Sequence, residues 1–78
     1  MARKFMDDDM ANWEAYVSGG QPGSTKISRI FFLCLDSPMN QARYIKHESR
    51  SVAAAERALV EMSDDDLRAG LAASVPND

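Results

Sequence analysis

The hydrophobic pattern is strongest in the middle of the chain. Residues 30–35 read Ile-Phe-Phe-Leu-Cys-Leu, an apolar run without a charge. A short apolar run of this kind, bounded by turn residues, is typical of a strand that is buried on both faces. Asp36, Ser37 and Pro38 follow it directly and favour a turn. We therefore predict a strand over 27–35 at the centre of a small sheet.

A second strand is predicted over 42–48, just beyond that turn. Side chains alternate between the two faces of a strand, so Tyr44 would lie on one face and Arg43 and Ile45 on the other. A connection this short joins antiparallel strands, whereas parallel strands need a long crossover. The two strands are therefore expected to pair as an antiparallel hairpin.

From residue 51 onward the hydrophobic period becomes helical. Val52, Ala55, Leu59 and Met62 form an apolar stripe at spacings of three and four residues. The alanines between them are strong helix formers. This pattern predicts a helix over 52–62.

A second helix is predicted over 64–74 from its first turn. Ser63 stands three residues before Asp66, which is a variant of the capping box that begins many helices. Met62 and Leu67 occupy the two positions of a hydrophobic staple around the same cap. The first helix is therefore expected to end just where the second begins.

Residues 8–18 fit two patterns. A helix would place Met10, Trp13 and Val17 on one face, at spacings of three and four. A strand would place Trp13, Ala15 and Val17 on one face by alternation. The aromatic content favours the strand, and the helix stays open as the alternative.

The predicted fold is one small α+β domain over residues 1–78, with loose ends at 1–6 and 76–78. A small antiparallel sheet of two or three strands carries the C-terminal helix pair on one face. The central strand is apolar on both sides, yet one helix pair covers a single face. The N-terminal segment or a second chain must therefore cover the other.

The sequence predicts a cytoplasmic protein without a membrane segment. Its single cysteine, Cys34, suits a reducing compartment. No stretch approaches the roughly 20 apolar residues that cross a bilayer. The formal net charge is −3, with a mildly basic middle and an acidic end, and neither region is charged strongly enough to mark a dedicated nucleic-acid binder.

No enzyme site emerges from the residue pattern. His47 is the only histidine and stands far from Cys34 in the sequence, so neither a zinc site nor a nucleophile with its base is suggested. The loop 19–26 has glycines, but Ser24 and Thr25 precede its lysine, the reverse of a phosphate-binding loop. We expect no catalytic residue, no metal ligand and no cofactor.

The leading functional hypothesis is a small binding protein that docks on a larger protein as an adaptor or inhibitor. An inhibitor of phage type, acting on a nucleic-acid-processing complex, is one form of it. Residues 51–78 hold two basic and six acidic residues, a net charge of −4, and would face the partner. The candidate contact residues are Glu56, Glu61, Asp64, Asp65 and Asp66.

Nucleic-acid binding and a structural homo-oligomer, such as a homodimer, are the alternatives. Residues 26–50 hold five basic and two acidic residues, a net charge of +3. The candidate contacts are Arg29, Arg43, Lys46 and Arg50, beside the aromatic residues Phe31, Phe32 and Tyr44. Aromatic rings on a sheet flanked by basic residues bind single strands. Phe31 and Phe32 point to opposite faces, so only one of them would be exposed.

Overall fold

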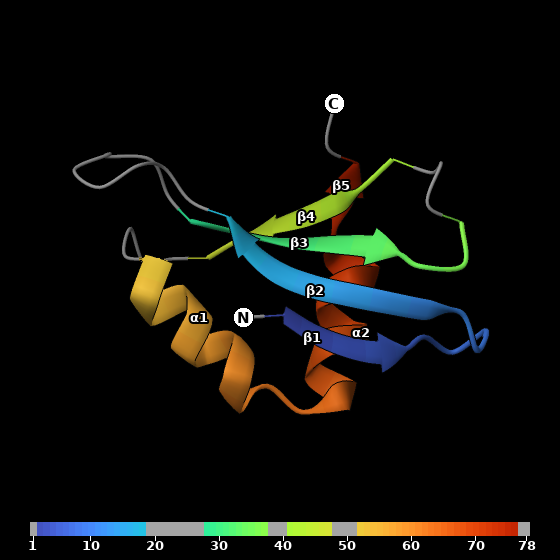
Figure 1. Cartoon of the computed structure of the whole chain (residues 1–78), viewed down its shortest axis with the longest axis horizontal. Coiled ribbons are helices and arrows are strands. Elements are labelled where there is room, and N and C mark those ends of the chain that lie inside the picture. The colour runs from blue at the N-terminus through green and yellow to red at the C-terminus, as the bar shows by residue number, and fades with distance from the viewer. Residues whose placement is uncertain (1, 19–27, 38–40, 48–51, 77–78) are drawn as a thin grey trace.

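A five-stranded antiparallel sheet forms one layer of the protein and two helices form the other (Figure 1). The computed structural model describes residues 2–18, 28–37, 41–47 and 52–76. The elements are β1 (Ala2–Met6), β2 (Asn12–Ser18), β3 (Arg29–Cys34), β4 (Arg43–Lys46), α1 (Val52–Glu61), α2 (Asp64–Ala73) and β5 (Val75–Pro76). The α+β class is confirmed, but the prediction of two or three strands was too low.

The strands follow their order in the sequence, so β3 is the central strand, as predicted. Ile30, Phe32 and Cys34 are buried on the face toward the helices. Phe31 and Leu33 are half-buried on the opposite face. Strand β4 pairs with β3 in antiparallel register, which confirms the predicted hairpin pairing.

Residues 12–18 form a strand, so the helical alternative for this segment is wrong. Ala15 is fully buried and lies opposite Phe32 in the sheet. Trp13 and Val17, on the same face, pack against the core. A helix would have turned Ala15 away from Trp13 and Val17, whereas the extended chain aligns all three with β3.

Residues 2–6 also form a strand, which corrects the prediction of a loose end at 1–6. Phe5 is 5% exposed and its ring meets that of Phe32 edge-on, with centroids 6.1 Å apart. Phe5 is the only buried residue of β1, so the sequence of this strand shows almost no hydrophobic pattern. It is held by pairing with β2 through the register Phe5↔Trp13.

The C-terminal end joins the opposite edge of the sheet. Val75 pairs with Tyr44 and Pro76 with Arg43, so the predicted loose end at 76–78 is wrong at its first residue. Residues 77–78 lie outside the described part of the chain. A strand of two exposed residues is too short for a pattern in the sequence to reveal it.

Both predicted helices are present, within one residue at each end. The capping box of α2 is formed: the backbone N–H of Asp66 donates to Ser63 Oγ, and that of Ser63 donates to Asp66 Oδ2, each at 3.1 Å. Leu67 is fully buried and Met62 packs against the core, as a hydrophobic staple requires. Neither described helix is long and apolar enough to span a membrane.

The core lies between the helices and one face of the sheet. Helix α2 runs behind the sheet in Figure 1. The buried core residues are Phe5, Ala15, Ile30, Phe32, Leu59 and Leu67. A Cβ at Gly70 would lie 3.2 Å from the Phe32 ring, so the absence of a side chain lets α2 approach the sheet closely.

Candidate functional site

The second face of the sheet carries a row of three aromatic side chains. Tyr16 on β2 lies opposite Phe31 on β3, and Phe31 lies opposite Tyr44 on β4. The rings of Tyr16 and Phe31 are stacked, with centroids 5.5 Å apart and an interplanar angle of 16°. Those of Phe31 and Tyr44 are 5.9 Å apart and tilted by 43°. The three half-buried rings form one aromatic surface across the middle of the sheet.

No described element lies over this face, because both helices pack on the other one. The N-terminal segment, which was a candidate to cover it, instead extends the sheet sideways as β1 and β2. We call the surface the open face. By register its residues include Ala2, Lys4, Met6, Asn12, Glu14, Tyr16, Arg29, Phe31, Leu33, Tyr44, Lys46 and Val75.

Two cations lie beside the aromatic row. Arg29 and Lys46 are opposite each other on β3 and β4, each two residues along its strand from a ring of the row. The guanidinium carbon of Arg29 is 4.7 Å from the centroid of the Tyr44 ring, a cation–π contact that holds this charge over the face. Lys46 is exposed.

The open face is basic, although the whole chain is acidic. Its described charged residues are Lys4, Arg29 and Lys46 against Glu14 alone, a balance of +2. Helices α1 and α2 hold five carboxylates against Arg57 and Arg68, a balance of −3. The two layers of the molecule therefore carry opposite charge, and an anionic ligand would be drawn to the sheet side.

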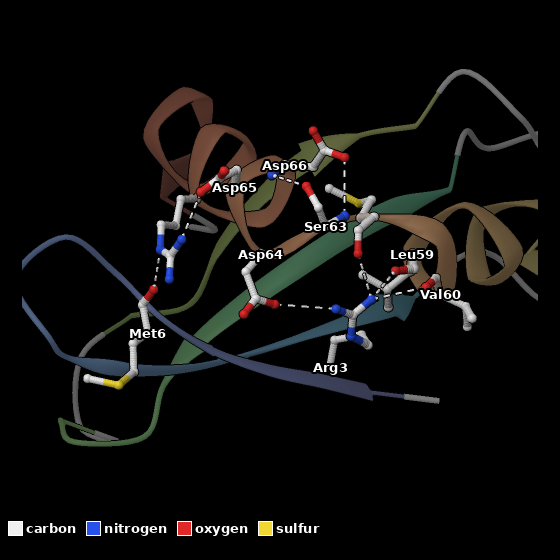
Figure 2. Close-up of polar contacts among 10 residues, drawn as sticks. Arg3, Met6, Leu59, Val60, Ser63, Asp64, Asp65 and Asp66 are labelled. Carbon is white, nitrogen blue, oxygen red and sulfur yellow. Dashed lines mark hydrogen bonds and ion pairs between the residues drawn. The ribbon is translucent and has the colours of Figure 1, made fainter.

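The acidic residues of α2 that the sequence singled out make contacts within the chain (Figure 2). Asp64 Oδ1 lies 3.4 Å from an Arg3 nitrogen and Asp65 Oδ1 lies 2.9 Å from Arg68 Nη1. Asp66 belongs to the capping box of α2.

The other two acidic candidates, Glu56 and Glu61, lie on the preceding helix α1. The five acidic candidates therefore belong to the helix layer, which faces away from the aromatic row. The carboxylates of the α2 triplet already fasten the start of that helix.

The basic residues that the sequence singled out are divided by the fold. Arg29 and Lys46 meet on the open face, whereas Arg43 points to the helix layer, where its Nε donates to Ser74 Oγ at 2.8 Å. Arg50 lies outside the described residues. Arg43 is therefore used to fasten β4 to the end of α2.

Sequence reasoning missed Tyr16 as a member of the site. Of the three aromatic residues it considered, Phe31 and Tyr44 lie on the open face and Phe32 is fully buried. The alternation that put Trp13 and Val17 in the core also put Tyr16 on the opposite face. Its partnership with Phe31 depended on register, which the sequence of β2 alone does not give.

Other reactive groups stand apart from the open face. Cys34 is buried in the core and unpaired. Among the described residues, no group of three His, Cys, Asp or Glu side chains could hold a metal ion.

Comparisons with family models, curated proteins and solved structures found no match to this chain. The aromatic row and its neighbouring charges are therefore the candidate functional site of the described residues.

Proposed function

We propose that this protein is a small non-enzymatic binding domain that holds single-stranded nucleic acid on its open face. The observation that carries the proposal is the aromatic row of Tyr16, Phe31 and Tyr44 beside the paired cations Arg29 and Lys46. Bases stack on exposed aromatic rings, and basic side chains beside the rings pair with phosphates. The half-buried rings of the row and the two cations bring both kinds of group to one surface.

The row supports a single strand rather than a duplex as the ligand. In a duplex the base faces are stacked on one another, so they are not available to rings on a flat sheet. The acidic helix layer also favours binding of the ligand on the sheet side. Its negative charge repels a polyanion, whereas the open face attracts one.

The direct test is fluorescence anisotropy of a labelled eight-nucleotide single strand, titrated with the protein at several salt concentrations. Phe31→Leu keeps an apolar side chain but removes the central ring. We expect it to weaken binding roughly tenfold, since one base–aromatic stack contributes about 1–3 kcal/mol. Lys46→Gln should reduce the slope of log K against log salt by about 0.7, the value of one phosphate contact on a single strand.

Arg57→Gln is the matched control for the charge change. Arg57 is exposed on α1, in the helix layer, so its loss removes the same charge from the other side of the molecule. It should leave the affinity and the salt slope close to those of the wild type. Circular dichroism of each variant separates a loss of binding from a loss of fold. Equal weakening by Arg57→Gln and Lys46→Gln would contradict the proposal.

Docking on a larger protein is the second candidate function, supported by the exposure of acidic side chains on α2. The side chain of Asp65 is 93% exposed and that of Asp64 57% exposed, and Glu61 is exposed nearby in the chain. These carboxylates would contact a basic groove of the partner. The anisotropy experiment separates the candidates: no binding of a single strand at low salt favours docking through this acidic surface.

A further inference from the structure

The aromatic row separates two regions of unequal charge on the open face. Arg29 and Lys46 lie on one side of it, two residues along their strands. Glu14 lies on the other side, two residues before Tyr16 on β2, between Lys4 on β1 and Leu33 on β3. The charges of Lys4 and Glu14 cancel, so that side is neutral whereas the side of Arg29 and Lys46 carries two positive charges. Two residues of a strand span about 7 Å, so the cations and the carboxylate flank the row at similar distances.

This asymmetry orients a nucleotide that stacks on the row. Its phosphate is attracted more strongly to Arg29 and Lys46 than to the other side of the row, where Glu14 offsets the charge of Lys4. The sugar and the hydrogen-bonding edge of a base lie at opposite ends of the nucleotide. A base with its phosphate on the cation side therefore directs that edge toward Glu14.

We infer that Glu14 selects the bound base, an inference that rests on the proposed function. A carboxylate only accepts hydrogen bonds, so it favours bases that present an amino group. Cytosine offers its N4 amino group to an acidic side chain. Thymine has a carbonyl oxygen at that position, which a carboxylate repels. The open face should therefore prefer cytosine to thymine.

Glu14 is available for this role. It is half-buried in the middle of the sheet, where a hydrogen bond is screened less than at an exposed site. Lys4 lies opposite it on the edge strand β1. Within the described residues no ion pair joins Lys4 to Glu14. Its oxygens therefore remain acceptors for a base.

The test compares an eight-nucleotide cytosine strand with an eight-nucleotide thymine strand, because the two pyrimidines are similar in size and stack on similar areas. For the wild type we expect about tenfold tighter binding of the cytosine strand, the effect of a hydrogen bond to a charged group. Glu14→Gln should bring this ratio close to one, since an amide both donates and accepts. The ratio is the readout, because removal of a negative charge raises both affinities.

Glu61→Gln is the matched control, since it removes an exposed carboxylate from α1 in the helix layer. It should leave the ratio of the two affinities unchanged. A wild-type ratio near one, or a preference for cytosine that survives Glu14→Gln, would overturn the role of Glu14. Binding of either strand would still support the proposed function in that case. Failure of both strands to bind at low salt would overturn the two together.

Discussion

Asp7 determines the turn between the first two strands. Its Oδ2 accepts a hydrogen bond from the indole N–H of Trp13 at 2.8 Å. Its Oδ1 accepts the backbone N–H groups of Asp9 and Ala11, at 2.8 and 2.9 Å. These bonds favour the ionised carboxylate, so the Trp13 bond first and the Ala11 bond second hold the pKa of Asp7 below its usual 3.8.

The lowered pKa predicts a loss of stability in acid. The ionised Asp7 stabilises the fold fully above about pH 3.8, and this contribution disappears as the pH falls through the lowered pKa. Asp7→Asn should therefore reduce the free energy of unfolding at pH 7 and flatten its dependence on pH below 4. Urea denaturation followed by circular dichroism, between pH 2 and pH 7, measures both effects.

Asp8→Asn is the control for this prediction, because Asp8 is exposed in the same turn and its carboxylate accepts no hydrogen bond that holds the turn. It should leave stability at pH 7 nearly unchanged. A variant Asp7→Asn with the acid dependence of the wild type would show that another group is responsible.

At this scale the sequence predicts what depends on near neighbours. The Ser63–Asp66 capping box was readable because its two residues stand three apart and bond to each other's backbone. The role of Asp7 could not be read from the sequence, because it depends on Trp13 six residues later and on the strand conformation of β2. The same dependence hid Tyr16 from the candidate site.

Strand β1 is joined to the helix layer by two arginines. Arg3 Nη1 donates to the backbone oxygens of Leu59, Val60 and Met62, at 3.0, 3.1 and 2.8 Å. These are carbonyls at the end of α1, where a helix leaves its acceptors without partners. Helix α1 has no basic residue in its own last turn, so Arg3 supplies the charge that favours this end.

Arg68 makes a second link, from the helix layer to the far end of β1. Its Nε donates to the backbone oxygen of Met6 at 2.7 Å, and its Nη1 pairs with Asp65 (Figure 2). The two arginines lie on different elements and fasten opposite ends of the strand. An edge strand with one buried residue is thereby fixed to the core.

Removal of Arg3 should therefore destabilise the fold. Arg3→Met removes the side-chain donor of three carbonyls at the end of α1, of which that of Leu59 keeps the backbone N–H of Met62. We expect a loss of about 2 kcal/mol in the free energy of unfolding. Lys4→Met is the matched control, since Lys4 is exposed on the other face of the same strand. It should change stability by less than about 0.5 kcal/mol. Similar losses from both, measured by chemical denaturation, would show that Arg3 does not act through α1.

At the scale of elements, the hydrophobic periodicity of the sequence predicted the elements that have a clear apolar pattern. The two helices and the strands β3 and β4 each have enough apolar positions to be recognised in this way. Strands β1 and β5 do not, because they are held by pairing at the two edges of the sheet and by distant side chains. Edge strands of this kind depend on tertiary contacts that no local pattern encodes.

At the scale of the whole molecule, the sheet divides the protein into two chemically different sides. One side is the acidic helix layer, with the core beneath it. The other is the basic open face with its aromatic row. The sequence showed that the central strand is apolar on both faces, and hence that one face lacked a cover. It did not show that this face carries rings from three neighbouring strands, because that required the register.

The most direct test of the central claim is a map of backbone amide shifts by NMR as an eight-nucleotide single strand is titrated into the protein. We predict that the largest changes fall at Tyr16, Phe31, Tyr44 and their neighbours on β2, β3 and β4. The exposed surface of α1 and α2 should change little. Changes centred on the acidic start of α2, with the aromatic row unaffected, would contradict the claim that the open face binds nucleic acid.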